Sequence, residues 1–315
     1  MKTISFVLPA YNEQDNINPV IQRIEELMCK FEKYNWEVIF INDGSFDNTD
    51  IVLKKLSSEN KKVKVLNLSR NFGHQTALWA GLYYASGDAI VSMDCDLQDP
   101  PEVIEKMISK WETGDKIVYA RRINYRNDNF LKKIGTKIYY KVLDKFSNVE
   151  IPHNVGDFRL IDKSVLLILK KMKERSKYIR GMVAWTGYRS SIIEYYRPDR
   201  EKGVSNYTFL KLFSLAINGL VGFSYIPLKL GLLMGVLSIL TGSGLLIYQI
   251  IDFFINNAYY HLYKWLIVVL FIFMGFLFIL MWIFGEYIAR IYDEVRFRPT
   301  FVIDTKLNFD ENINS

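Results

Sequence analysis

The sequence predicts an α/β protein with a mostly parallel sheet and helices on both faces, followed by an interfacial helical region and two transmembrane helices. Three observations predict this. Strand-like and helix-like runs alternate through residues 1–200, the order expected of a parallel sheet covered by helices. Polar residues follow each predicted strand. Charged residues nearly vanish between Leu230 and Gly285, where Asp252 and Lys264 are the only two.

Composition limits the class of protein. The chain has 315 residues, half of them hydrophobic, and a formal net charge of +6. This excludes a disordered tail or a collagen-like chain and allows one large domain or two modest ones. The only two cysteines, Cys29 and Cys95, make no disulfide framework, which indicates a reducing compartment for the part that contains them.

The alternating runs are short and follow one another closely. Strands are predicted at Ser5–Pro9, Trp36–Ile41, Val63–Leu68, Ala89–Met93 and Lys116–Ala120, and helices at Ile17–Phe31, Asp47–Leu56, His74–Ser86 and Pro101–Trp111. Ligands of such sheets bind beyond the carboxyl ends of the strands, so the residues after each strand are the candidate site. Neither a Gly-x-Gly-x-x-Gly turn nor a Gly-x-x-x-x-Gly-Lys-Ser/Thr loop is present, which argues against a dinucleotide cofactor or a P-loop NTPase.

An Asp-x-Asp pair follows the fourth predicted strand. Asp94 and Asp96 are two carboxylates on a strand-to-loop turn, and they suit a hard cation such as Mg²⁺ or Mn²⁺ that shares its ligand sphere with phosphates. The amide oxygen of Gln98 is a further candidate ligand. The alternative is a solvated acidic turn. The position of the Asp-x-Asp pair at the end of a buried strand favours the metal site.

The loops after the first two strands carry groups that suit a nucleoside. Asp43 lies in Asn-Asp-Gly-Ser, which is also ordinary turn chemistry. Its carboxylate could accept hydrogen bonds from a base or ribose. Tyr11 offers a stacking face, and Glu13 offers an acceptor for a ribose.

Two apolar stretches, at about Leu228–Ile251 and Trp265–Phe284, each have the roughly 20 residues that span a bilayer. The alternative, a buried helical hairpin, is disfavoured because neither stretch has a polar face. Basic residues flank the pair, so both termini are expected in the cytoplasm. The preceding segment, Tyr207–Tyr225, is either an interfacial helix or a helix packed on the soluble domain.

Further motifs extend over nearly the whole chain in a fixed order. They are VLPAYNEQDNI (7–17), FINDGSFDNT (40–49), LSRNFGHQTALWAGL (68–82), MDCDLQDPPE (93–102), GDFRLIDK (156–163), Arg200-x-x-Gly203-x-Ser205-x-Tyr207, and GEYIARIYDEVRFRP (285–299). With them the chain closely resembles family 2 glycosyltransferases that load a sugar onto a polyprenyl phosphate. The kin include dolichol-phosphate mannose synthase and bacterial undecaprenyl-phosphate glucosyltransferases.

The resemblance implies a cytoplasmic GT-A (Rossmann-like) catalytic domain, a metal-dependent nucleotide-sugar donor and inversion at the anomeric carbon. It implies a nucleotide pocket, a Mg²⁺ or Mn²⁺ site, a catalytic carboxylate and a segment that closes on the phosphates. The corresponding residues are Pro9, Tyr11, Glu13, Asp43 and Asp94 for the nucleotide; Asp94, Asp96 and Gln98 for the metal; Asp157 for catalysis; and Arg200, Ser205 and Tyr207 for the closing segment. Asn206 stands where the family usually has Lys, so this segment carries one positive charge fewer.

The acceptor phosphate needs cationic partners near the membrane. Among the basic residues that follow the fifth strand, Arg122 and Lys133 are favoured because related enzymes use this region. The alternative for Lys133 is the solvated face of a helix. Anionic headgroups would attract the same cations, so the charges alone do not identify an acceptor site.

These features predict an enzyme that transfers a hexose from a nucleotide sugar, UDP-glucose first, to undecaprenyl phosphate for cell-envelope glycosylation. Other donors remain open: UDP-N-acetylglucosamine, UDP-galactose, a UDP-aminopentose and GDP-mannose. A processive polysaccharide synthase is disfavoured because the chain lacks Gln-x-x-Arg-Trp. A transporter is disfavoured because the middle of each span carries no ionisable residue. A catalytically dead membrane scaffold is disfavoured by the intact acidic motifs.

The expected organisation has four parts: a cytoplasmic catalytic domain (1–204), a juxtamembrane segment (205–227), two transmembrane helices with a short extracytoplasmic link (228–287), and a cytoplasmic tail (288–315). The protein is expected in the inner (plasma) membrane as a multi-pass protein. Its expected partners are the donor, the polyprenyl-phosphate acceptor and the bilayer, without nucleic acid, and relatives suggest a homo-oligomer.

Overall fold

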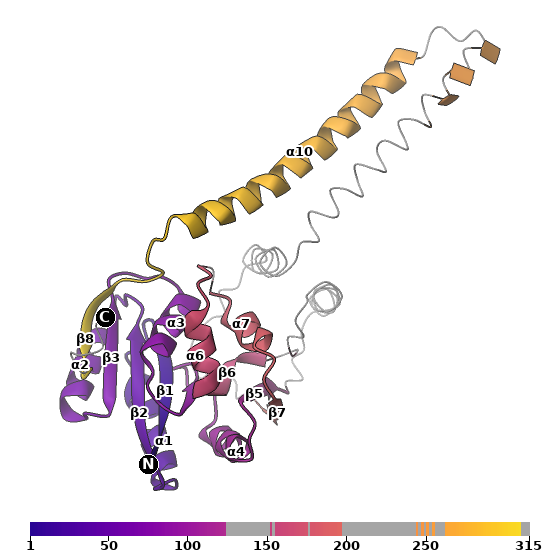
Figure 1. Ribbon diagram of the computed structural model, residues 1–315. Coiled ribbons are helices and arrows are strands. Elements are labelled where there is room, and N and C mark those ends of the chain that lie inside the picture. Colours follow the sequence, from indigo (N-terminus) through magenta and orange to yellow (C-terminus); the bar gives the residue numbers. More distant parts are fainter. Residues whose placement is uncertain are drawn as a thin grey trace. The chain divides into compact units, whose positions relative to one another are not determined.

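The computed structural model describes residues 1–123, 152, 155–175, 177–196, 244, 247–248, 250–251, 254–255 and 262–309 (Figure 1). The chain divides into two compact units, one with the sheet and its helices and one with the long helix α10 (Leu262–Val295). The strands are β1 (Lys2–Ala10), β2 (Tyr34–Asn42), β3 (Val63–Leu68), β4 (Ala89–Ser92), β5 (Ile117–Arg122), β6 (Val155–Asp162), β7 (Ser190–Tyr195) and β8 (Ile303–Leu307). The helices of the first unit are α1 (Ile17–Cys29), α2 (Thr49–Glu59), α3 (His74–Tyr84), α4 (Pro101–Glu112), α6 (Lys163–Lys171) and α7 (Ile179–Trp185).

The strands form one sheet in the order β7-β5-β6-β4-β1-β2-β3-β8. From β1 the chain builds outward through β2 and β3, then returns to place β4 on the other side of β1, and all of these pairings are parallel. This reversal of strand order is a topological switch point, where open α/β sheets bind ligands. The nine predicted strands and helices agree with the observed ones to within about three residues at each end.

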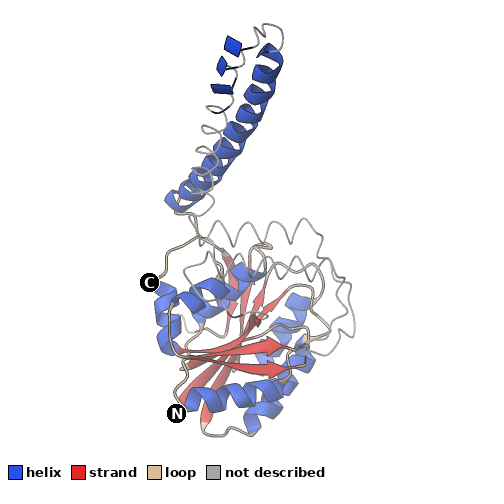
Figure 2. Cartoon of the chain, turned by 90° about the vertical axis from the view of Figure 1, so that its right-hand side faces the viewer, coloured by secondary structure: helices blue, strands red, loops and turns tan. Residues whose placement is uncertain are grey.

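Helices lie on both sides of the sheet (Figure 2), and an apolar core fills the space on each face. Successive residues of a strand point to opposite faces, and β2 shows it: Val38 and Phe40 join one core, while Ile39 and Ile41 join the other. Side chains from α1, α2 and α4 complete the first core, and those from α3, α6 and α7 complete the second. The predicted helix-covered sheet is therefore confirmed.

The sheet is more mixed than a wholly parallel one. Strand β6 runs antiparallel to both β4 and β5, so its first residues, not its last, lie at the carboxyl edge of β4. That reversal brings Asp157 to the same edge as Asp94. Strand β8 comes from the tail after α10 and pairs antiparallel with β3. Part of the segment expected as a cytoplasmic tail thus extends the sheet.

Helix α10 contains the second predicted span, Trp265–Phe284. Its 34 residues rise about 1.5 Å each. The helix is therefore longer than the hydrocarbon core of a bilayer is thick, about 30 Å. Within the described residues, the stretch Phe273–Val295 is the one helix that is long and apolar enough to cross a membrane. The first predicted span, Leu228–Ile251, and the segment Tyr207–Tyr225 lie largely or wholly outside the described residues.

A buried carboxylate fastens the amino-terminal part of the sheet. Glu37 accepts hydrogen bonds from Ser5 Oγ and from the backbone N–H and hydroxyl of Ser86, and it forms an ion pair of 2.6 Å with Lys64. We expect Glu37→Gln to lower the free energy of unfolding by about 3 kcal/mol, because Lys64 loses its anionic partner in a mostly buried position. Thermal unfolding of the full chain in detergent measures this.

The effect of Glu37→Gln should depend on pH. Burial raises the pKa of Glu37, but the hydrogen bonds from Lys64 and Ser5 outweigh it, and the pKa lies below its ordinary value. The stabilisation is therefore complete above the unfolded pKa of about 4.3 and is lost as pH falls through the folded pKa. Glu59→Gln, in an exposed pair with Lys55, is the control and should change little. An equal effect of the two substitutions would refute this role.

Candidate active site

The loops after β1 and β2 are joined by backbone-to-side-chain hydrogen bonds. Asn12 N–H donates to Ser45 Oγ at 3.0 Å, and Phe46 N–H donates to Asn12 Oδ1 at 2.9 Å. These contacts place the ring of Tyr11 edge-to-face with that of Phe46, 5.8 Å between centroids. Tyr11 is 41% exposed and Phe46 is 83% exposed. Two aromatic rings therefore stand open to solvent beside this edge of the sheet.

The Asp43 carboxylate joins β2 to the loop before α3. It is buried and accepts hydrogen bonds from the backbone N–H groups of Phe72 (2.7 Å) and Gly73 (2.9 Å). Burial raises the pKa of Asp43, and these two N–H groups oppose the rise. Gly44 has φ +67°, and a Cβ there would lie 2.6 Å from the backbone of Arg70. The turn therefore requires glycine.

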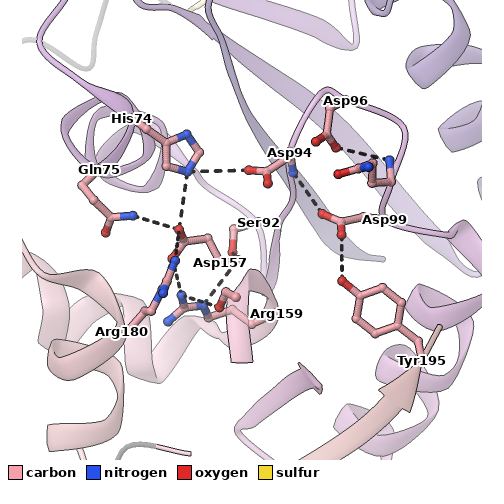
Figure 3. A network of polar contacts seen from close by, with 12 residues as sticks. His74, Gln75, Ser92, Asp94, Asp96, Asp99, Asp157, Arg159, Arg180 and Tyr195 are labelled. Atoms are coloured by element: carbon pink, nitrogen blue, oxygen red, sulfur yellow. Dashed lines mark hydrogen bonds and ion pairs between the residues drawn. The ribbon is translucent and has the colours of Figure 1, made fainter. Parts of the chain in front are cut away.

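The acidic loop after β4 is held in a defined shape (Figure 3). Asp94 N–H donates to Asp99 Oδ2 at 3.2 Å, and Gln98 N–H donates to Asp96 Oδ1 at 3.2 Å. The hydroxyl of Tyr195, on β7, donates to Asp99 Oδ1 at 3.0 Å. Asp99 thereby ties the Asp-x-Asp turn to the far strand of the sheet.

Arg122, one of the two favoured acceptor-site cations, lies at the end of β5. Its Nε donates to the hydroxyl of Tyr195 at 3.2 Å. Its guanidinium also lies against Gly156, because a Cβ at that glycine would be 3.0 Å from Arg122 Nη2. The side chain thus lies next to the residue that precedes Asp157, and it connects to the Asp94 loop through Tyr195 and Asp99.

Asp157 is the centre of the polar network in Figure 3. Its side chain is buried and forms ion pairs with Arg159 at 2.7 Å and with Arg180 at 3.0 Å. Gln75 Nε2 donates to Oδ2 at 2.8 Å, and the hydroxyl of Ser92 donates to the backbone carbonyl of Asp157. Burial alone would raise the pKa of Asp157, but the hydrogen bond from His74 and the charge of Arg180 hold it well below its usual range.

His74 bridges the two acidic positions. Its Nε2 lies 3.6 Å from Asp94 Oδ1 and 3.5 Å from Asp157 Oδ2. Burial lowers the pKa of His74, but the hydrogen bond to Asp157 and the charge of Asp94 outweigh it and raise the pKa. One imidazole therefore separates the Asp-x-Asp turn from Asp157.

The carboxylates of the loop after β4 fit a divalent cation that is bound by protein and substrate together. Within the described residues, no three His, Cys, Asp or Glu side chains form a group that could hold a metal alone. Mg²⁺ is ordinarily bound through one or two carboxylates together with substrate phosphates and water, which matches the pair Asp94 and Asp96. The Gln98 side chain is buried within this loop.

The remaining predicted residues lie in two different situations. Pro9 is buried in β1 opposite Ile41, and Glu13 N–H donates to Thr49 Oγ1 at 3.0 Å. The other favoured acceptor-site residue and the closing segment lie outside the described residues: Lys133, Arg200, Ser205 and Tyr207. Their positions stay predictions.

The network also contains residues that the sequence analysis did not select. Arg159 could have been predicted, because it lies two residues after Asp157 on the same strand and the two side chains must share a face. Three of the others lie within the motifs at 68–82 and 93–102, which gave them no separate role, and the remaining two, from α7 and β7, lie outside every motif. These five residues are His74, Gln75, Arg180, Asp99 and Tyr195.

Comparisons with known proteins agree with this architecture. The model of the family "Glycosyl transferase family 2" matches residues 5–167. An uncharacterized glycosyltransferase of Bacillus subtilis, YkcC, is 39% identical over 301 residues, covering 95% of this chain and 92% of the relative. The bactoprenol glucosyl transferase of Shigella phage SfII is 38% identical over 304 residues, covering 95% and 97%.

Among solved structures, the chain is similar to glucosyl-3-phosphoglycerate synthase from Mycobacterium tuberculosis in complex with Mn²⁺, UDP and phosphoglyceric acid. The TM-score is 0.46 at 19% identity, covering 70% of this chain and 76% of that one. The family model spans half of the chain, and the sequence relatives align over nearly all of it. The chain therefore belongs to glycosyltransferase family 2 and is a glycosyltransferase.

Proposed function

We propose that this glycosyltransferase transfers a hexose, with glucose from UDP-glucose favoured, to the phosphate of a polyprenyl lipid such as undecaprenyl phosphate. The geometric observation that carries the proposal is the juxtaposition of Asp94 and Asp157, each within 3.6 Å of His74 Nε2. It puts a candidate diphosphate site next to a buried, ionised carboxylate. The choice of acceptor is supported by the relatives named bactoprenol glucosyl transferases, which align over 95% of this chain.

The nucleotide would lie along the carboxyl edge of β1, β2 and β4. Tyr11 offers a ring for the base, Glu13 and Asp43 offer acceptors for its polar groups, and Asp94 and Asp96 face the diphosphate. A bound Mg²⁺ or Mn²⁺ would offset negative charge on the diphosphate as it leaves. The Asp-x-Asp turn is already fixed by its bonds to Asp99 and Gln98, so little ordering is needed when the donor binds.

The reaction is an in-line displacement. An oxygen of the acceptor phosphate forms a bond to the anomeric carbon, the bond from that carbon to the diphosphate breaks, and its electron pair leaves with the nucleoside diphosphate. A phosphate monoester has a second pKa of about 6, so the nucleophile is already mostly dianionic. Asp157, held as an anion, then orients the sugar or nucleophile. Arg122 and Lys133 are proposed to bind the acceptor phosphate.

The membrane part would place the enzyme beside its lipid acceptor. The acceptor's tail stays in the bilayer and its phosphate lies at the surface. We propose that α10 and the preceding apolar stretch, Leu228–Ile251, anchor the chain in the inner membrane as a multi-pass protein with a cytoplasmic catalytic unit. One candidate spanning helix within the described residues supports the anchor.

The test is sugar transfer by the full chain in membranes. Radiolabelled UDP-glucose, UDP-N-acetylglucosamine, UDP-galactose, a UDP-aminopentose and GDP-mannose are each incubated with undecaprenyl phosphate, and label in the lipid fraction is measured. We expect label from UDP-glucose above the other donors. Absence of transfer from every donor by folded protein would refute the proposed function. Transfer from a different donor would correct the sugar and keep the acceptor.

Removal of the Tyr11 ring should weaken donor binding. Stacking of a base on an aromatic side chain is worth about 1–3 kcal/mol, so Tyr11→Ala is expected to raise the Kd for UDP by about 5- to 150-fold. Titration calorimetry measures it. Tyr83→Ala removes a similarly exposed tyrosine, 48% against 41% for Tyr11, from α3 and should leave the Kd unchanged. Equal Kd values for the wild type and Tyr11→Ala would contradict the placement of the base.

A further inference from the structure

The Asp157 carboxylate has its hydrogen-bonding capacity filled. Arg159 Nη2 donates to Oδ1 at 2.7 Å, and Arg180 Nε donates to the same oxygen at 3.0 Å. Arg180 Nη2 donates to Oδ2 at 3.0 Å, and Gln75 Nε2 donates to it at 2.8 Å. Two carboxylate oxygens offer about four lone-pair positions. These four hydrogen bonds, with His74 Nε2 a further 3.5 Å from Oδ2, leave neither oxygen without a protein partner.

The two arginines differ in their freedom to move. Arg159 is on the same strand as Asp157, its side chain is 2% exposed, and Nη2 also donates to the carbonyl of Gly156. Arg180 comes from α7, and its side chain is 34% exposed. Gln75 approaches from a third element, α3. Among these donors, Arg180 is the arginine that reaches solvent, and it contacts both oxygens.

The contact of Arg180 has a specific geometry. Its Nε and Nη2 bind Oδ1 and Oδ2 separately, which is the fork-to-fork arrangement that fixes the plane of a carboxylate. The terminal torsion of an aspartate is broad, so without this fork the plane is set by separate contacts from Arg159, Gln75 and His74. Figure 3 shows the Arg180 guanidinium next to the Asp157 carboxylate, which His74 and Gln75 also contact.

We infer that Arg180 is a positioning residue for the transfer reaction: its bidentate contact sets the orientation of the Asp157 carboxylate in the site. This rests on the proposed function, in which Asp157 acts on the sugar or the nucleophile. It goes beyond that function because neither the motifs nor the comparisons assign any role to Arg180.

The fold itself does not depend on this arginine. Helix α7 packs its inner side, through Ile179, Met182 and Val183, into the second apolar core. Those contacts remain when the guanidinium is removed. Arg180→Ala should therefore fold, and its effect should fall on catalysis.

The experiment measures initial rates of sugar transfer by the full chain in nanodiscs, with donor and undecaprenyl phosphate each varied. A small displacement of a catalytic group costs up to about 100-fold, so kcat of Arg180→Ala should fall about 10- to 100-fold. The KM values should stay at the wild-type values, because the groups proposed to bind both substrates are intact. Arg180→Lys keeps the charge but loses the planar fork, so it should recover only part of kcat.

Two controls separate positioning from loss of charge or fold. Arg189→Ala removes another arginine–aspartate contact, 2.7 Å from Asp115, and should leave kcat unchanged. Guanidinium chloride at a non-denaturing concentration should raise kcat of Arg180→Ala and leave that of Asp157→Asn unchanged, because only the first variant retains the carboxylate that the added cation binds.

Three results would overturn the inference: a wild-type kcat in Arg180→Ala, a raised acceptor KM with unchanged kcat, or complete recovery in Arg180→Lys. If Arg180→Ala does not fold, Arg180→Lys decides alone, since a folded variant with wild-type kcat overturns the inference and one with lowered kcat supports it. Absence of transfer by the wild type from every donor refutes the proposed function. An active wild type with an unaffected Arg180→Ala refutes only the role of Arg180.

Discussion

Replacement of Asp157 by Asn is expected to lower kcat about 100-fold or more, by the same factor across neutral and mildly alkaline pH. Burial would raise the pKa of this carboxyl, but the His74 hydrogen bond and the charge of Arg180 hold it well below its usual range. A lowered pKa keeps the group ionised throughout that range, so it takes up no proton from the nucleophile. The variant loses the anion that orients the reaction.

The measurement is the pH–rate profile of Asp157→Asn against that of the wild type. Because the acceptor phosphate is mostly dianionic above its second pKa of about 6, both profiles should rise with that ionisation and then run parallel. A variant that is slowed severely only at low pH would contradict the orienting role and indicate base catalysis. Thermal unfolding confirms that the variant is folded.

Removal of the divalent cation is expected to be the second large effect. EDTA should lower sugar transfer at least about 100-fold, and added Mn²⁺ or Mg²⁺ should restore it. The reason is that a metal ion stabilises the charge that develops on the leaving diphosphate by several kcal/mol. The double variant Asp94→Ala with Asp96→Ala should show the same low rate with or without metal. It should also lack the increase in UDP affinity that Mn²⁺ gives the wild type in calorimetry.

Asp50→Ala is the matched control, since Asp50 forms a helical pair with Lys54 on α2. Its transfer rate and metal dependence should equal those of the wild type. Undiminished transfer in EDTA, together with a metal-independent UDP affinity in the wild type, would contradict the proposed metal site.

The elements that the sequence predicted well are those with strong periodicity. Val63–Leu68 begins and ends at the predicted residues, because its short length favours a strand over a helix. The carboxyl-edge loops followed from the same pattern. The prediction that their polar groups lie near one another depended only on parallel strands ending at one edge.

The contacts that the sequence did not predict are long-range. Strand β8 pairs with β3, although residues 208–297 of the second unit separate the two strands in the sequence. No local pattern in Ile303–Leu307 indicates its partner. Arg180 reaches Asp157 because α7 packs on the second core, and Tyr195 reaches Asp99 across 96 residues of sequence. Charged groups that act as partners carry no periodic signal, so only the packed fold reveals them.

The product of the reaction tests the central claim most directly. The full chain is incubated with undecaprenyl phosphate, the donor that labels it and Mn²⁺, and the purified lipid is studied by mass spectrometry and by ³¹P and ¹H nuclear magnetic resonance. The account predicts one hexose on the lipid phosphate, as a phosphodiester whose anomeric configuration is opposite to that of the donor. A retained configuration, a lipid diphosphate or a chain of several sugars would contradict it.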